Sequence, residues 1–465
     1  MFKSIASAGI FLLLFLGIHF QSNAQIKIAR INIEGNVKTK SHIILRELPY
    51  SVGSVISKDS LSILNTIAKN QLINTSLFLD ATITTNYDDS TNIGIQIQVS
   101  ERWYLFPIPY FRWVDRNFNE WWSTQHHSLD RVNYGLNFKQ ANASGNNDKL
   151  VIGLITGYTQ QAVVKYQFPY IDKKMRFGLG MGWQYYSQKE LNYTTRFDKQ
   201  VFTKTVQPIQ SGYRANLNVL YRPNLFERHI LQIGFGNANI TDSGLIAQPK
   251  YFPNYQPSFS YIDVSAAFTK TRFDYNPYPT HGSSHEYSIY QRFSGGNNLT
   301  SFQLRDVIAH KINKANTLWF ESNMQAKLMP NQNYIDRKLV GYGTMQLNGF
   351  DYYVIDGNAA GIFKAEWHHL LTSFTVPKYS GIGLIDQITK RLPTIKYNFW
   401  LKAFTNVGYV YSEHPSNTSK LSNTLLKTFG VGLDIISVYD LVIKIDYSVN
   451  QLGDKGVYLH GGINF

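Results

Sequence analysis

The chain of 465 residues contains no cysteine. Disulfide bonds and thiolate metal sites are therefore excluded, and the fold has to be held together by packing and hydrogen bonding. Beyond residue 20 the sequence also lacks any run of eighteen consecutive apolar residues, so we expect no transmembrane helix there. Acidic residues are outnumbered, because 31 Asp and Glu face 45 Lys and Arg, which gives a formal charge of +14.

Motifs that carry enzyme chemistry are missing as well. The sequence has no G-x-S-x-G elbow, no P-loop and no H-E-x-x-H pair. Its basic residues form neither a Lys/Arg run nor a basic helix, which argues against a nucleic-acid partner. We therefore predict that the protein is not an enzyme, has no catalytic residues and needs no cofactor or metal. Anionic lipid headgroups or a polar lumen fit the basic excess better.

The first 24 residues have the pattern of a secretory signal peptide. Lys3 is followed by an apolar run over residues 9–20, and Ser22 and Ala24 supply the small side chains that a signal peptidase requires. A membrane anchor is the alternative, but a run of twelve residues is too short to span a bilayer. We expect cleavage after Ala24.

Residues 25–102 are predicted to form a small α+β domain. The segment IKIARINIEGN alternates apolar and polar residues and ends in a Gly-Asn turn signal. Two segments with helical spacing follow, and LFLDATITTN and TNIGIQIQVSE then return to a period of two. The order strand, helix, helix, strand, strand places helices on one face of a small sheet.

Residues 103–465 are predicted to form a membrane barrel. Segments of roughly ten residues alternate with turn signals, as in MRFGLGMGWQYY, where large apolar residues share one face and arginine, glycine and glutamine share the other. A soluble β-sandwich shows the same alternation. The signal peptide, the number of strands and the content of 31 Tyr, 29 Phe and 8 Trp favour the barrel.

The number of strands supports closure of this sheet. Sixteen segments are expected, and an even number is what a closed antiparallel barrel with both ends on one side requires. The fold class is therefore mainly β, a 16-stranded antiparallel transmembrane β-barrel after one small α+β domain. The segments begin near residues 105, 131, 148, 160, 174, 210, 227, 257, 283, 299, 316, 357, 396, 423, 439 and 456.

Two parts of the chain resemble known families. INIEGNVKTKSHIILREL, Gly53 and NTSLFLDATI resemble a POTRA (polypeptide-transport-associated) domain. The stretch KTRFDYNPYPTHGSSHEYSIY resembles a strand-and-turn motif of the BamA/TamA superfamily of sixteen-stranded barrels. Its matching positions are Arg272, Asp274, Pro279, Thr280 and Gly282.

A second motif of this superfamily lies in the loop over residues 330–357. The resemblance implies that the loop folds into the lumen with an Arg-Gly-aromatic tip, and here Gly349 and Phe350 match but Asn348 replaces the arginine. In the family, acidic groups on the barrel wall hold this arginine, and a neutral amide loses that charge-assisted, forked contact. We expect Glu366, at the family's acidic position, to bond Asn348 or to face another cation. We also expect the loop to plug the lumen.

The ends of the predicted barrel carry two further signals. The chain ends in GVYLHGGINF, which resembles the assembly signal of bacterial outer-membrane barrels through Val457, Leu459, Ile463 and Phe465. In the first strand, Pro107 and Pro109 cannot donate to a sheet ladder. They are expected to weaken the seam between residues 104–113 and 456–465.

The resemblance implies a function at the outer membrane of a Gram-negative bacterium, with the N-terminal domain in the periplasm. The protein would assist the insertion, assembly or translocation of other polypeptides, capturing an extended strand at an exposed sheet edge. Its partners would be outer-membrane lipid and client polypeptides or a periplasmic protein. A dedicated two-partner secretion transporter and a passive pore are the alternatives, and the sequence does not indicate an oligomeric state.

Overall fold

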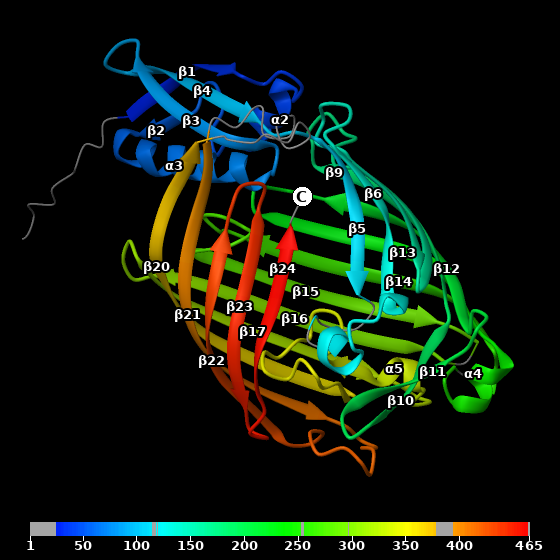
Figure 1. Ribbon diagram of the computed structural model, residues 1–465. Coiled ribbons are helices and arrows are strands. Elements are labelled where there is room, and N and C mark those ends of the chain that lie inside the picture. Colours follow the sequence, from blue (N-terminus) through cyan, green and yellow to red (C-terminus); the bar gives the residue numbers. More distant parts are fainter. Residues whose placement is uncertain are drawn as a thin grey trace, which may run out of the picture.

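A computed structural model describes residues 25–113, 118, 120–252, 255–295, 297–377 and 394–463. The predicted signal peptide and Phe465 lie outside the described residues. Figure 1 shows the two parts of the chain, a small N-terminal domain and a large curved sheet whose strand ends the domain covers. Among the described residues, no helix is both long and apolar enough to cross a membrane.

The N-terminal domain is a four-stranded sheet with two helices. Its strands have the order β2-β1-β4-β3, with β1 parallel to β4. In β4 the alternating Ile93, Ile95 and Ile97 are at most 1% exposed and pack with Ala68 and Leu72 of helix α3, so the period of two marks the buried face. The predicted α+β domain is confirmed, with a short strand, β2, added. The elements are β1 (Gln25–Glu34), α2 (Ser41–Arg46), β2 (Val55–Ser57), η1 (Lys58–Ser60), α3 (Leu61–Asn74), β3 (Phe78–Tyr87) and β4 (Asn92–Glu101).

The large sheet has sixteen strands, each antiparallel to its neighbours, which confirms the predicted fold class. Every strand begins within three residues of its predicted start. The strands are β5 (Leu105–Trp113), β6 (Val132–Ala141), β7 (Lys149–Gly157), β8 (Thr159–Phe168), β9 (Phe177–Gln188), β12 (Gln210–Tyr221), β13 (Glu227–Ile240), β14 (Ser258–Thr271), β15 (Gly282–Phe293), β16 (Leu299–Lys311), β17 (Asn316–Leu328), β20 (Ala359–Pro377), β21 (Thr394–Tyr411), β22 (Leu425–Ile436), β23 (Leu441–Asn450) and β24 (Lys455–Ile463).

Side chains alternate between the outer face of the barrel and its lumen. On β9, Leu179, Met181 and Trp183 are 43–58% exposed on the outside, and the glycines between them face inward. Inward positions on other strands carry charge, as at Asp263, which is fully buried and paired with Arg214. An apolar exterior around a charged interior is what the sequence alternation predicts.

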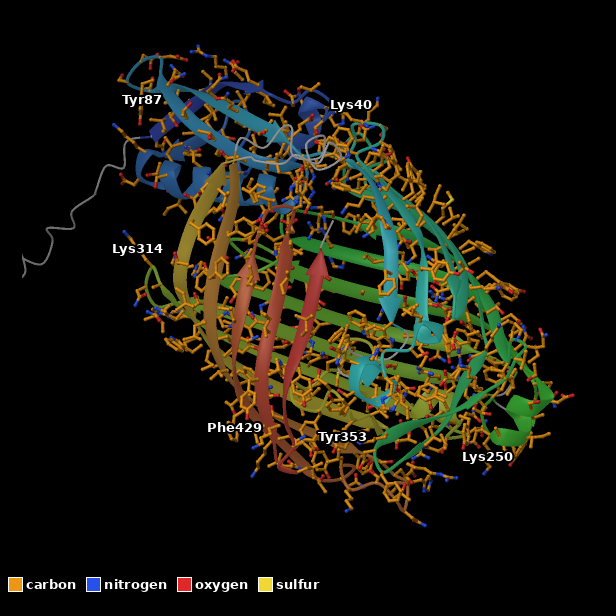
Figure 2. The ribbon with its side chains drawn as sticks, viewed as in Figure 1. Lys40, Tyr87, Lys250, Lys314, Tyr353 and Phe429 are labelled. Atoms are coloured by element: carbon orange, nitrogen blue, oxygen red, sulfur yellow. The ribbon has the colours of Figure 1, made fainter. Side chains whose placement is uncertain are left out.

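Shorter elements gather at the barrel end away from the N-terminal domain, which we call the distal end. The connection between β9 and β12 folds into a hairpin, and the one between β17 and β20 contains a helical turn and two short strands. Figure 2 shows Tyr353 of the latter connection and Lys250 at this end. The elements are η2 (Glu120–Thr124), η3 (Leu129–Arg131), β10 (Glu190–Arg196), β11 (Lys199–Lys204), α4 (Asp242–Ala247), α5 (Tyr334–Arg337), β18 (Lys338–Val340) and β19 (Ile355–Asp356).

Two buried ion pairs fasten the N-terminal domain to the opposite, proximal end of the barrel. Glu47 makes a two-pronged contact with Arg222 in the β12–β13 turn, at 2.5 and 2.6 Å. Arg102 does the same with Asp440 in the β22–β23 turn, at 2.8 and 3.0 Å. Because these turns belong to strands far apart in the sheet order, the domain bridges the proximal end of the barrel (Figure 1).

The first of these pairs is stable only while Glu47 is ionised. Burial alone would raise the pKa of the Glu47 carboxyl, but the charge and hydrogen bonds of Arg222, with help from Arg46, hold this pKa below its usual value. The pKa of Arg222 is raised, because the attraction of Glu47 outweighs the loss of hydration. Docking therefore gains free energy from Glu47 at pH values above the ordinary carboxyl pKa, and loses it as the pH falls through the lowered one.

We predict that Glu47→Gln weakens docking by about 3–5 kcal/mol at pH 7, since it leaves the Arg222 guanidinium buried without its counter-charge. Amide hydrogen exchange in the β12–β13 turn should rise in the variant. The wild type should show the same rise only after acidification below pH ~4.3, the ordinary glutamate pKa. Glu34→Gln, an exposed site in the same domain, is the matched control. Equal exchange in both variants would contradict the prediction.

Candidate functional site

The first candidate region is the seam between the two edge strands of the sheet. β5 and β24 stand at the ends of the strand order, and no hydrogen-bonded register joins them within the described residues. Their described parts have nine residues each, close to the ten of their neighbours β6 and β23, whereas β13 and β14 across the barrel have fourteen. At about 3.3 Å per residue, nine residues extend roughly 30 Å and fourteen roughly 46 Å.

Pro107 and Pro109 lie on the seam side of β5. Ala141 N donates to Tyr104 O at 2.8 Å, next to the pair of Leu105 with Gln140, so even-numbered residues turn their backbone groups toward β6. The odd-numbered prolines consequently direct their ring nitrogens, which carry no hydrogen, toward the seam. The pairing of β5 with β6 is intact, and the edge has lost two donors.

The residues of the predicted assembly signal lie on the other side of the seam. Val457 and Leu459 on β24 are 56% and 43% exposed on the outer face of the barrel. Between them Tyr458 points inward and is 2% exposed. Ile463 is the last described residue of β24, and Phe465 lies outside the described residues. The strand thus has the alternation that the sequence predicted for it.

The second candidate region is the connection between β17 and β20, residues 329–358, which we call the plug. Phe350 at its tip is 2% exposed and packs with Leu347, Ile362 and Leu426 in a cluster shared with the barrel wall. Gly349 has φ +82°, and Asn450 on β23 donates to its carbonyl at 2.9 Å. A Cβ there would lie 3.0 Å from the Ser448 hydroxyl, so glycine fits both the conformation and the space.

The distal end of the plug is held by polar contacts that sequence reasoning missed. Arg292 on β15 makes a buried, two-pronged ion pair with Asp336 of the plug, at 2.7 and 2.8 Å. Asp198 at the tip of the β10–β11 hairpin accepts a hydrogen bond from Val354 N of the plug at 2.8 Å. Its carboxylate accepts another from Lys420 N at 2.8 Å, in the β21–β22 connection. The hairpin therefore ties the plug to the far side of the barrel.

Asn348 contacts an acidic group on the wall other than Glu366. Its side-chain amide donates to Asp446 on β23 at 3.1 Å. For Glu366 we expected either Asn348 or another cation as the partner, and its carboxylate lies 2.8 Å from His368 Nε2. Asn348 bonds Asp446 rather than Glu366.

Lys402 supplies positive charge beside Asn348. Its ammonium lies 2.8 Å from Asp446 and 3.2 Å from Asp434, and all three side chains are at most 1% exposed. The register pairs Lys402 with Gly432, and Gly432 with Asp446, so the three form one row across neighbouring strands. A Cβ at Gly432 would lie 2.2 Å from an Asp446 oxygen, which explains the small residue between the two charges. In the sequence, the signal that could have identified this charged site was a lysine at an inward-facing position of a barrel strand.

The strand-and-turn motif builds the connection between β14 and β15. The Asp274 carboxylate accepts hydrogen bonds from Thr280 N at 2.9 Å and His281 N at 3.1 Å, and from the Thr280 hydroxyl. Gly282 has φ +112°, and a Cβ there would lie 1.9 Å from the carbonyl oxygen of Arg272. The motif residues therefore close the turn through backbone contacts that other residue types could not make.

This turn also reaches the charged lumen. The Arg272 guanidinium lies 4.8 Å from the centre of the Phe226 ring, outside the turn. Tyr278, next to Pro279, donates to Asp434 at 3.0 Å and stacks on His368. Cavities of about 360 and 420 Å³ are lined jointly by this turn, the wall and, in the first case, the plug. The turn, the wall and the plug thus meet around one set of charges.

Comparisons with known proteins agree with this architecture. The POTRA family, described as "Surface antigen variable number repeat", matches residues 26–102. The structure of BamA from Haemophilus ducreyi lacking POTRA domains 1–3 is 14% identical, with a TM-score of 0.52, and the match covers 94% of this chain and 84% of that one. CdiB from Escherichia coli is 10% identical, with a TM-score of 0.54, covering 95% of this chain and 76% of that one. Among curated proteins no match is found.

At these identities the solved structures establish the fold. The protein is a sixteen-stranded barrel with the fold of the BamA and CdiB structures, and it is preceded by one domain that matches the POTRA family.

We predict that Lys402→Met lowers the free energy of unfolding of the barrel by about 3–5 kcal/mol, since Asp434 and Asp446 would remain buried without their cation. Adding Asn348→Arg should recover most of this loss, because residue 348 already reaches Asp446. Urea unfolding in detergent micelles, followed by the heat-modifiable gel shift, measures both effects.

Lys364→Met is the matched control for this pair of variants. Lys364 lies 3.8 Å from Glu321, but Arg305 also contacts Glu321 at 2.7 Å, so the carboxylate keeps a partner. Its loss should stay below about 1 kcal/mol. An equal loss in the two lysine variants, or no recovery with the arginine, would show that Lys402 does not hold the plug contact.

Proposed function

We propose that this protein is an outer-membrane factor that helps other β-barrel proteins insert and fold, admitting their strands through the seam between β5 and β24. The observation that carries the proposal is the edge of β5, where Pro107 and Pro109 remove two donors from the seam. A barrel that only had to form a stable wall would gain from hydrogen bonds at these positions.

The short strands on both sides of the seam support the same function. In the described residues, the strands at the seam and their neighbours have nine or ten residues, whereas β13 and β14 across the barrel have fourteen, and a bilayer adapts to a shorter apolar band by thinning locally. Thinner bilayer lowers the cost of inserting a partly paired strand. We assign the POTRA domain to the periplasm, and β3, an edge strand of its sheet, to the first capture of an extended client.

The two alternatives are less well supported by the contacts. A passive pore needs an open lumen, but the plug is held by the Arg292–Asp336 pair and by Asp198, and the POTRA domain is fastened across the proximal end. A secretion transporter would have to break the same contacts to pass a chain through the lumen. CdiB shares this fold, so a dedicated secreted partner remains the second candidate. Entry through the seam requires neither barrier to open.

The test is the rate at which a urea-unfolded outer-membrane barrel folds into liposomes that contain this protein. Pro107→Val with Pro109→Val should slow folding about thirtyfold, because two restored hydrogen bonds of about 1 kcal/mol each favour the closed seam. Pro208→Val in the β11–β12 connection is the control and should have no effect. An unchanged rate in the double variant would refute entry through the seam. Ion conductance of the wild type comparable to that of an open porin would favour the pore.

A further inference from the structure

The outer wall of the barrel carries an acidic residue at a depth where lipid chains are expected. Phe302 and Ile308 on β16 are 47% and 48% exposed, so the even-numbered residues of this strand face outward, and Asp306 is among them. Its outward neighbours along the strand are Leu304 and Ile308, and the strand ends at the proximal side with Lys311. At about 3.3 Å per residue and a strand tilt of about 40°, Asp306 lies roughly 13 Å above that end. An ionisable residue at such a depth is costly and indicates a functional site.

Asp306 belongs to a row of four ionisable residues on the outer face. From β13 to β16 the row consists of Glu227, Lys270, His285 and Asp306, each paired in the register with the next. The Lys270 ammonium lies 2.9 Å from Glu227, and His285 Nδ1 lies 2.6 Å from Asp306. Glu227 is the first residue of β13. The row therefore begins at the proximal rim of the wall and rises toward the membrane centre.

The deep end of the row has two acceptors that no donor reaches within the described part of the chain. His285 Nδ1 and the Tyr287 hydroxyl donate to the same oxygen of Asp306, at 2.6 and 3.2 Å, which leaves the second carboxylate oxygen without a donor. With its hydrogen on Nδ1, the neutral imidazole presents Nε2 as the other acceptor. Lys270 has three N–H donors and contacts one carboxylate, that of Glu227. A ligand that fits the row brings N–H donors to the acceptors and an acidic oxygen to the lysine.

An apolar groove of about 980 Å³ adjoins the row on the outer wall. Tyr287, which donates to Asp306, also lines the groove, so the two are continuous. In the register Ala266 stands between Leu231 and Ile289, and its small side chain leaves room between these larger ones. Counted from β5, β14 and β15 are the eighth and ninth of the sixteen strands, so the groove lies across the barrel from the seam (Figure 1).

We infer that the row and the groove together bind one phospholipid whose headgroup carries a primary amine. The headgroup ammonium donates to Asp306 and to His285 Nε2, the phosphate accepts from Lys270, and an acyl chain lies in the groove. A headgroup without an amine fits less well, because the row holds two carboxylates and only one ammonium when the histidine is neutral. The bound headgroup lies closer to the membrane centre than its neighbours, which thins this leaflet locally. Lipid binding here does not depend on whether the seam admits client strands.

Native mass spectrometry of the full-length protein tests this inference. The protein is released from liposomes that contain equal amounts of dioleoyl phosphatidylethanolamine and dioleoyl phosphatidylcholine, which share chains and phosphate but differ in the N–H donors of the headgroup. The wild type should retain about tenfold more of the ethanolamine lipid, because the choline headgroup cannot make the charge-assisted hydrogen bond. His285→Phe with Asp306→Leu should abolish the preference without lowering barrel stability, since apolar residues suit a lipid-facing wall. Lys270→Gln should lower retention of both lipids equally.

Gln291→Leu with Thr300→Val is the matched control and should keep the preference. These two residues make another cross-strand hydrogen bond on the outer face of β15 and β16, at 2.5 Å. Equal retention of the two lipids by the wild type, or a preference that survives in the His285 and Asp306 double variant, would overturn the inference.

Two further results would also overturn it. One is stronger retention of dioleoyl phosphatidylglycerol, which has a phosphate but no amine. The other is a protein dimer that retains no lipid, which would identify a second copy of this chain as the occupant of the groove. Because the comparison of the three lipids uses the wild type, it decides the question even if the double variant does not assemble.

Discussion

Backbone hydrogen bonding is the constraint on which this structure depends. A sheet that closes in a membrane has to satisfy the N–H and C=O groups of every strand, because lipid offers no partner for them. Fourteen inner strands of the barrel meet this demand from both sides. The remaining two face each other across the seam, and one of them has proline at two of the positions where donors are needed. The weak point is therefore built into the covalent chain of β5.

Buried charge holds the rest of the assembly around this weak point. Ion pairs of Glu47 and Arg102 fasten the POTRA domain to turns that lie far apart in the sheet order, and the pair of Arg292 with Asp336 fixes the distal part of the plug. Burying each pair costs several kcal/mol of desolvation free energy, and the attraction between the two charges offsets this cost only when their geometry is good. Such contacts specify one arrangement rather than adding much stability. They hold the POTRA domain and the plug in place on both sides of the seam.

In the lumen, the barrel wall supplies the positive charge beside the tip of the plug. The tip of the plug has an amide at position 348, and the positive charge comes from Lys402 on the wall. Both groups contact Asp446, so the plug and the wall share one acidic anchor. The contact between Asn348 and Asp446 is one hydrogen bond from an uncharged amide, which is weaker than a forked ion pair.

The strands were predictable from sequence because a barrel wall imposes a local pattern, a period of two that turn residues interrupt, and each neighbour in the sheet is also a neighbour in the chain. Pro107 and Pro109 could be recognised in the sequence as positions without an N–H donor, because proline lacks this group in any strand. The ion pairs could not be predicted, since Glu47 and Arg222 are 175 residues apart and meet only once two domains dock. Asp446 rather than Glu366 as the partner of Asn348 depends on how far the plug turns inside the lumen, which the register of the wall does not determine.

The central claim is that this protein serves many barrels through its seam, and the most direct test is the outer-membrane proteome shortly after the protein is depleted. The account predicts that several unrelated barrel proteins fall together while their transcripts stay constant. Loss of one secreted protein alone, or no change in any barrel, would contradict it.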